Sequence, residues 1–480
     1  MKLPALNVVI ANKPVLTICL VFFIVCFLLS ALIPPMQSPD ETDHIKRAYL
    51  LSRGVIFLDA PAGSSSGGRI DTGLMEYINA CFEIAGRPDI KLSMMQLDYL
   101  KKIKWTGKYD FSVTPGTGYY FPAIYIPQAA GLFLGKIMGL TIDRSYRLVR
   151  LLTLLTVMIF FFLAFNFFFP GPLVFAFLVI PMSLFQFSSA SIDGVSTAAA
   201  VLALSAFMKI ISEREKTDSG LLYILCGSIM LVASCRFHLM SLILLLFYLY
   251  YATREKKYLK AAGITALFVF LWTIIALLTT VDNRVDIGAS AFKILIYHVS
   301  NPVRFLRITI ATLVYKDIYY NMYTYANYLA FYRESFLGLL GWLDTPFLKS
   351  TYFYLFYLLL LIGILNIPVK QIKTGWQTRS VLLLCSAVSF LLVFLALVIA
   401  ANKHPASIVH GIQGRYFIVP AILAAYALGE NGAIYISRLK KAAFALLIIF
   451  FLYSVYSTAD LLIVRYYCEH PERTYLLKNK

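Results

Sequence analysis

The feature that most constrains this chain is a series of apolar runs, many of which approach or exceed the ~20 residues that cross a bilayer. Of its 480 residues, 60% are hydrophobic and only 14% are charged. Inside lipid, backbone N–H and C=O groups must be paired within the chain, which favours helices. The pattern predicts an all-α polytopic membrane protein, with residues 1–480 forming one integral-membrane domain.

The first apolar run, residues 14–33, predicts a retained membrane anchor. It is too long for the core of a signal peptide, and no small-residue cleavage site stands before Pro34 and Pro35. Lys2 and Lys13 precede the run, so we expect the amino terminus on the cytoplasmic side.

Basic loops indicate the direction in which each later run crosses the membrane, because Lys and Arg concentrate in cytoplasmic loops. The loop Lys209–Lys216 is expected to be cytoplasmic, which requires that one of the runs before it does not cross. The run 119–141, with Pro122 and Pro127 near its start, is the weakest and is expected at the outer surface. The prediction is then about eleven transmembrane helices and outer juxtamembrane helices, with two large extracytoplasmic loops at 34–147 and 281–350.

The formal net charge of +18 has two interpretations. The basic residues could flank anionic lipid, or they could serve an anionic substrate such as a lipid phosphate. No compact basic domain or nucleic-acid motif is present, so no nucleic-acid partner is expected. The seven cysteines are scattered without metal-type spacing, which favours neither a disulfide framework nor a zinc site.

The stretch PPMQSPDETDHIKRAY, residues 34–49, is the leading candidate for a site. It follows the first run directly and places acids and bases together in a chain with few charges. Its candidate residues are Asp40, Glu41, His44 and Arg47. The alternative is structural, because acids complement the positive end of a helix dipole and Pro39 suits a helix start.

The expected topology brings further charges to the same face. Asp193 could act there or cap a helix. Arg144, Arg147 and Arg150 have helical spacing and could hold a substrate or anchor lipid headgroups. Arg236 and Arg415 lie in short loops between spans, where a functional role is favoured. The candidates are Asp193, Arg144, Arg147, Arg150, Arg236, His238 and Arg415.

An acid beside several arginines at a membrane boundary suits transfer of a group from a membrane-anchored phosphate. Arginine binds phosphate oxygens in a bidentate manner. A carboxylate within reach of an acceptor hydroxyl can act as a general base. The tyrosine-dense segment 315–332 favours an interfacial aromatic belt, with a platform for sugar rings as the alternative.

Four stretches resemble a bacterial family of polytopic membrane proteins of unknown function that lies within or beside the GT-C glycosyltransferases: residues 34–49, YFPAIYIPQAAG at 120–131, GWLD at 341–344 and GIQGRYF at 411–417. The resemblance implies a GT-C-like fold in the bacterial cytoplasmic (inner) membrane. It implies an active site on the extracytoplasmic face, with Asp40 as the base, Glu41 beside it and Asp193 as a second acid. It fixes neither the sugar nor the acceptor.

The expected function is inverting transfer of a sugar from a polyprenyl-phosphate donor to an envelope glycan or lipid. The residues expected to bind the donor phosphate or substrate are His44, Arg47, Arg147, Arg150, Asp193, Arg236, His238 and Arg415. No cofactor is expected, although a divalent ion (Mg²⁺ or Mn²⁺) held by Asp40, Glu41 and His44 is left open. The alternatives are a flippase or transporter of a lipid-linked saccharide and a non-catalytic scaffold of envelope assembly.

Overall fold

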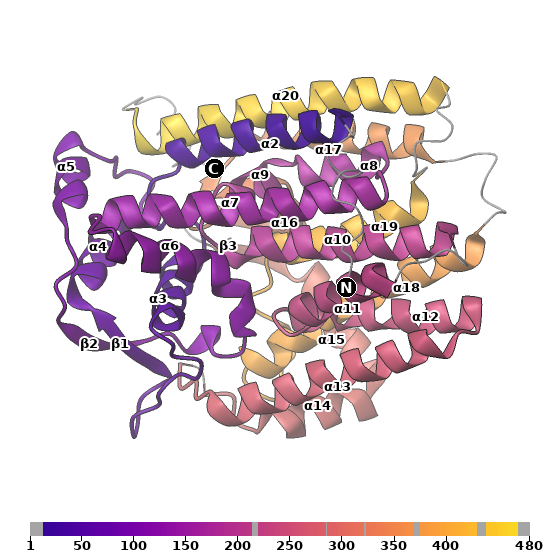
Figure 1. The fold of residues 1–480 in the computed structure, drawn as a ribbon, viewed down its shortest axis with the longest axis horizontal. Helices are drawn as coiled ribbons and strands as arrows, with labels where there is room; N and C mark the ends of the chain where they lie inside the picture. The colour runs from indigo at the N-terminus through magenta and orange to yellow at the C-terminus, as the bar shows by residue number, and fades with distance from the viewer. Residues whose placement is uncertain are drawn as a thin grey trace.

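The computed structural model describes residues 13–213, 219–284, 286–320, 323–367, 375–429 and 438–468. Its helices form a bundle in which the long members run side by side (Figure 1), and the predicted all-α membrane protein is confirmed. Seven helices are long and apolar enough to cross a membrane: α2 (Lys13–Leu32), α7 (Ile142–Phe167), α10 (Ile192–Glu213), α13 (Lys256–Thr279), α17 (Lys349–Asn366), α18 (Trp376–Ala400) and α20 (Arg438–Tyr466).

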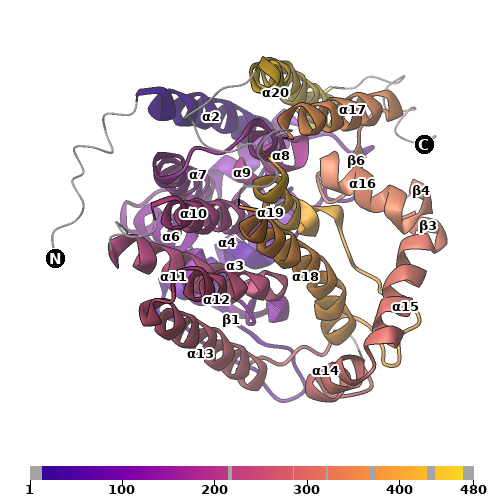
Figure 2. The same ribbon diagram turned by 90° about the vertical axis from the view of Figure 1, so that its right-hand side faces the viewer.

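Helix α10 lies in the middle of the bundle and α2 at its edge (Figure 2). The most apolar 18-residue window of α10 is 83% buried, against 22% for α2. The reason lies in composition: α10 is rich in Ala and Ser, and small side chains let neighbouring helices approach closely. Because Asp193 is in the first turn of α10, this packing also fixes a charged side chain among the other helices.

Seven membrane-length helices among the described residues fall short of the eleven expected. The run 171–189 is interrupted, because Pro181 has no N–H to continue a helix. Three other expected spans are short helices, and the basic loop Lys209–Lys216 lies partly outside the described residues. The elements of these regions are α8 (Pro172–Leu178), α9 (Pro181–Phe187), α11 (Ser219–Ala233), η4 (Phe237–Leu242), α12 (Ile243–Thr253), η5 (Gly414–Phe417) and α19 (Ile418–Leu428).

The polar segment after α2 gathers at one end of the bundle, on the left of Figure 1. Its two strands pair antiparallel with Gly67 opposite Val113. The elements are α3 (Glu41–Ser52), β1 (Gly67–Asp71), α4 (Thr72–Phe82), α5 (Met94–Lys102), β2 (Tyr109–Val113), η1 (Pro115–Thr117), η2 (Pro122–Tyr125) and α6 (Ile126–Ile137).

Helix α6 is shorter than a span and packs along α7. Gly131 and Gly135 make this possible, because a Cβ at Gly131 would lie 2.6 Å from the Val149 Cα atom, and one at Gly135 would lie 2.4 Å from the Ser145 hydroxyl. The close contact holds the first turns of α7, where Tyr146 stands, against the segment that carries α3.

The second polar segment has its own apolar core, on the right in Figure 2. Four of its tyrosines are buried there, namely Tyr323, Tyr325, Tyr328 and Tyr332. The expected aromatic belt is therefore wrong for them, although Tyr315 and Tyr319 are exposed. The elements are α14 (Ala291–Ser300), α15 (Pro302–Val314), β3 (Lys316–Tyr320), β4 (Tyr323–Asn327), α16 (Tyr328–Gly338), β5 (Leu339–Leu340) and β6 (Thr345–Pro346).

Candidate functional site

The loop from Pro34 to Asp40 joins α2 to α3 with an unusual backbone. Met36 and Asp40 both have a φ of 62°, in the left-handed region that non-glycine residues rarely adopt and that Asp tolerates better than most. Asp40 occupies the N-cap position of α3, yet its carboxylate makes no capping hydrogen bond. Its side chain is therefore directed away from the helix it precedes.

The Asp40 carboxylate is instead the first member of a chain of ion pairs, which we name the open network: Asp40, Arg415, Asp193 and Arg236. Arg415 Nη2 donates to Asp40 Oδ2 at 2.6 Å, and its Nη1 donates to Asp193 Oδ2 at 3.1 Å. Arg236 Nη2 donates to the other oxygen of Asp193. The structure thus brings together four residues that the sequence analysis had placed on one face, from four separate parts of the chain.

Arg415 is held in place by the glycine before it. A Cβ at Gly414 would lie 2.1 Å from the Tyr332 carbonyl oxygen of α16, so only glycine fits there. The Gly414 N–H donates to the Ser335 hydroxyl at 2.8 Å. The GRYF turn therefore packs against α16, and the Arg415 side chain extends to the two acids.

The open network is exposed only at one end. The Asp40 side chain is 56% exposed, whereas that of Arg415 is 3% exposed. The protein around Asp40 would by itself raise the pKa of its carboxyl, but the positive charges of Arg415 and Arg236 outweigh this and hold the pKa below its usual value. Asp40 is thus an ionised carboxylate that solvent can reach.

His44 lies one turn further along α3 and is buried. Its Nδ1 shares a hydrogen bond of 2.9 Å with the Tyr125 hydroxyl. Burial lowers the pKa of His44 to about 3, so the ring is neutral at neutral pH. His44 was among the residues expected to bind the donor phosphate or substrate, and a neutral, enclosed imidazole adds no positive charge for a phosphate.

Tyrosines adjoin the open network, and sequence reasoning did not assign them to the site. The Arg236 guanidinium lies 5.2 Å from the centre of the Tyr120 ring, and that of Arg415 lies 5.3 Å from the Tyr416 ring. Burial raises the pKa of Tyr320, on which the charges of Arg415 and Asp40 also act. The signal was present, because Tyr120 and Tyr416 fall inside the quoted motifs.

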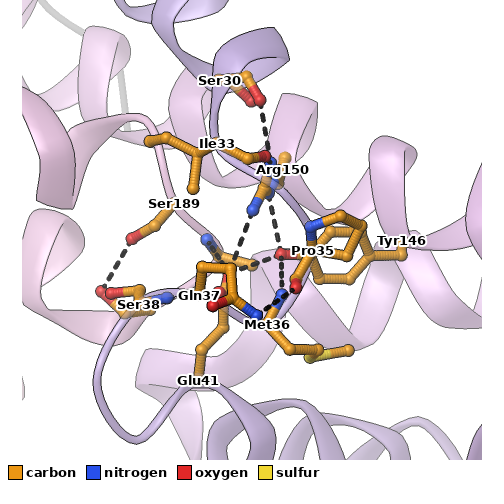
Figure 3. Close-up of polar contacts among 12 residues, drawn as sticks. Ser30, Ile33, Pro35, Met36, Gln37, Ser38, Glu41, Tyr146, Arg150 and Ser189 are labelled. Atoms are coloured by element: carbon orange, nitrogen blue, oxygen red, sulfur yellow. Dashed lines mark hydrogen bonds and ion pairs between the residues drawn. The ribbon is translucent and has the colours of Figure 1, made fainter. Parts of the chain in front are cut away.

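Glu41 is placed very differently from Asp40, although the two are adjacent. It is fully buried and accepts hydrogen bonds from the Tyr146 hydroxyl at 2.6 Å, the Ala190 N–H at 2.8 Å and the Ser38 N–H at 3.1 Å (Figure 3). Arg150 Nη2 lies 3.9 Å from Glu41 Oε1. We name Glu41, Tyr146 and Arg150 the closed network. Both Glu41 oxygens are occupied and away from solvent, so its geometry is that of an anchor for the loop and not of a group that meets substrate.

Two of the arginines expected at the donor phosphate bind backbone carbonyls instead. Arg150 donates to the carbonyl oxygens of Ser30, Ile33 and Pro34 at 2.8, 2.6 and 2.9 Å, which satisfies acceptors at the end of α2 (Figure 3). Arg47 donates to the Val55 and Ile56 carbonyl oxygens at 3.0 and 2.6 Å.

The remaining candidates lie outside the open network. Arg147 is 59% exposed and pairs through Nε with Asp143 at 2.9 Å. Arg144 is exposed on the same helix. His238 is buried in η4. Its burial and, to a smaller degree, the positive charge of Arg236 lower the pKa of His238 to about 3.

The GWLD turn, residues 341–344, supports the loop between α2 and α3. Trp342 Nε1 donates to the Met36 carbonyl oxygen at 2.8 Å. Asp344 accepts from the fully buried Arg465 at 3.0 Å, which ties the turn to the end of α20. The GWLD stretch, one of the four that carry the family resemblance, therefore holds residues 34–41 in position.

The described residues contain no group of three or more His, Cys, Asp or Glu side chains arranged to hold a metal ion. Asp40, Glu41 and His44, the three candidates, have separate partners: Arg415, Tyr146 and Tyr125.

Comparison with known proteins gives one match. The sequence profile of a family described as "Predicted membrane protein (DUF2142)" matches residues 22–424. The match covers the loop 34–41 and all four residues of the open network. Neither the curated proteins nor the solved structures contain a match.

Proposed function

The chain belongs to the DUF2142 family of predicted membrane proteins, and we propose that it is an inverting glycosyltransferase with a GT-C-like fold. The observation that carries the proposal is the half-exposed carboxylate of Asp40, which stands directly after a membrane span and ion-pairs with a buried arginine. The donor is a sugar linked to a polyprenyl phosphate, and the acceptor is a cell-envelope glycan or lipid.

The reaction is a single displacement at the anomeric carbon. The acceptor hydroxyl oxygen attacks that carbon as the bond from the carbon to the phosphate oxygen breaks, and polyprenyl phosphate leaves with the bonding electron pair. Asp40 accepts the proton of the acceptor hydroxyl. One base and stabilisation of the leaving group are sufficient, and this is what a lone exposed carboxylate beside arginines can supply.

The arginines bind the donor phosphate by exchanging a carboxylate partner for phosphate oxygens. In the open network two carboxylates balance Arg236 and Arg415. An arriving phosphate competes with Asp40 for Arg415, since guanidinium binds phosphate oxygens well. Loss of the Arg415 pair removes a charge that lowers the pKa of Asp40, so donor binding would make Asp40 a better base.

Tyr120, Tyr320 and Tyr416 supply the aromatic surface near this carboxylate on which a sugar ring can stack. We place the site on the extracytoplasmic face of the bacterial inner membrane, in agreement with the expected topology. The reaction is written without a metal ion. A requirement for Mg²⁺ or Mn²⁺ would appear as loss of transfer in EDTA and its return on adding the ion.

The test is transfer by purified full-length protein, with a panel of polyprenyl-phosphate sugars and the native envelope glycan as acceptor. Asp40→Asn is expected to lower the rate by about 10²- to 10⁴-fold, the usual contribution of a general base. Asp110→Asn is the matched control, since Asp110 is an exposed acid of β2. Transfer by Asp40→Asn at the wild-type rate would overturn the assignment of the base.

The two alternatives predict other results in cells. A flippase predicts that a strain without the protein keeps its lipid-linked saccharide on the inner leaflet. A glycosyltransferase predicts that this saccharide is flipped and accumulates unused. A scaffold predicts that Asp40→Asn and Arg415→Gln leave the envelope glycan unchanged as long as the protein is present at its normal level.

A further inference from the structure

A groove of about 580 Å³ lies where α2, α7 and α20 meet the polar segment. The C-terminal turn of α2 and the first turns of α7 form two of its sides. Lys91 donates to the Val464 and Arg465 carbonyl oxygens, which brings the end of α20 to the same place. The helices reach this end of the bundle beside α5, as Figure 1 shows.

The charges on the groove have one sign. Lys101, Arg147 and Arg150 line it, and no Asp or Glu does. Arg150 is occupied by the carbonyls at the end of α2, but Lys101 and Arg147 are 51% and 59% exposed. Asp98 pairs with Lys101 and Asp143 pairs with Arg147, but neither acid lines the groove. A negative ligand is therefore favoured at this end.

The other end of the groove is apolar. Phe27 of α2, Leu151 and Leu154 of α7 and Ile463 of α20 line it. Leu154 is seven residues beyond Arg147 on the same helix, which is about 10 Å at 1.5 Å per residue. The groove thus runs from a basic end at the membrane boundary to an apolar end among spans, and this is the polarity of a lipid with a charged headgroup.

From this geometry we propose that the groove binds an anionic phospholipid, with the phosphate on Arg147 and Lys101 and an acyl chain along Phe27 and Leu154. The occupant is a structural lipid and not the glycosyl donor, because none of Asp40, Asp193, Arg236 and Arg415 lines the groove. Tyr146 and Arg150 do line it and belong to the closed network. A bound lipid therefore also supports the loop that carries Asp40.

The structure offers matched controls for this site. Arg144 is exposed on the same helix as Arg147, and Lys102 is exposed beside Lys101, but neither lines the groove. Two double variants remove the same charge from α5 and α7: Lys101→Gln/Arg147→Gln inside the groove and Lys102→Gln/Arg144→Gln outside it. Leu151→Trp fills the groove without any change of charge.

The experiment titrates the purified full chain in neutral detergent with phosphatidylglycerol and, separately, phosphatidylcholine, and counts bound lipids by native mass spectrometry. We expect tighter binding of phosphatidylglycerol, weakened about 25-fold by Lys101→Gln/Arg147→Gln at about fivefold per basic residue. The control pair should change it less than twofold, and Leu151→Trp should prevent binding.

Phosphatidylglycerol should also raise the melting temperature of the wild type more than that of Lys101→Gln/Arg147→Gln. Equal binding of the two lipids would overturn the proposal, since it would mean that the groove does not select a net negative headgroup. Equal loss in the two charge-matched variants would also overturn it, since it would mean diffuse attraction instead of a site. No step of the experiment involves glycosyl transfer, so its result is separate from that of the transfer assay.

Discussion

Two networks of carboxylates and arginines meet at the peptide bond between Asp40 and Glu41, and they differ in their access to solvent. In the open network the terminal carboxylate, Asp40, is 56% exposed. In the closed network Glu41 is fully buried and its oxygens accept from Tyr146 and from two backbone N–H groups. The two acids carry the same charge but have opposite surroundings.

If the protein is the glycosyltransferase proposed above, the difference separates stability from activity within two adjacent residues. Removing one partner of a buried ion pair leaves an uncompensated charge and strongly destabilises the fold. Removing a half-exposed carboxylate costs little, because water replaces it. Glu41 should therefore matter to the fold and Asp40 to the proposed reaction, which can be tested by comparing variants at the two positions.

The largest effect on stability is expected for Glu41→Ala, which leaves Arg150 without its carboxylate and Tyr146 without its acceptor. We expect the free energy of unfolding to fall by about 3–5 kcal/mol. For Asp40→Ala we expect a loss of at most about 1 kcal/mol. Chemical unfolding of the two variants in detergent measures both values, and equal losses would show that the two networks do not differ as described.

The next effect concerns Asp193, the acid that joins the buried Arg415 to the partly buried Arg236. Asp193→Asn leaves Arg236 without its carboxylate partner in the network, and we expect a loss of about 3 kcal/mol. Removing that arginine as well should restore part of it, so Asp193→Asn/Arg236→Gln should be more stable than Asp193→Asn. A double-mutant cycle measures the coupling, and a coupling near zero would mean that the pair does not contribute.

A smaller effect is expected from pH. His44 has a folded-state pKa of about 3, below its ordinary value of 6.5, so the stability gained from burying it neutral is complete above about pH 6.5 and is lost as the pH falls towards 3. From pH 7 to pH 5 this amounts to about 2 kcal/mol, at about 1.4 kcal/mol per pH unit. Asp40 has a lowered pKa and stays ionised over this range.

Thermal unfolding at the two pH values tests this expectation. His44→Asn keeps a polar group near Tyr125 but does not titrate, so its loss of stability between pH 7 and pH 5 should be smaller than that of the wild type. An identical pH dependence in the two proteins would contradict a neutral, buried His44.

The smallest effect is expected for Tyr120→Phe. The Arg236 Nη1 atom lies 3.5 Å from the Tyr120 hydroxyl, a long hydrogen bond, and the ring that faces the guanidinium is kept. We expect a change of less than about 1 kcal/mol in the free energy of unfolding. A larger loss would mean that this hydroxyl, and not the ring, holds Arg236.

Particular residues show how far the sequence could predict the site. Asp40, Asp193, Arg236 and Arg415 were all candidates, because charges beside apolar runs are rare in such a chain. The sequence could not separate Arg147 from Arg150, which share one helix face. It also could not show that Tyr323 and Tyr325 pack in a core, because tyrosine suits both a membrane interface and a core with a polar edge.

The sequence by itself determined the class of the protein and the set of charged residues from which a site could be built. Hydropathy and charge are local properties, and the lipid environment leaves helices as the main solution for long apolar runs. Only the tertiary structure decided which of two neighbouring acids faces solvent. Glu41 is buried by contacts with Tyr146 and Ala190, and Asp40 pairs with Arg415. These partners lie 105, 149 and 375 positions away, beyond the reach of a local pattern.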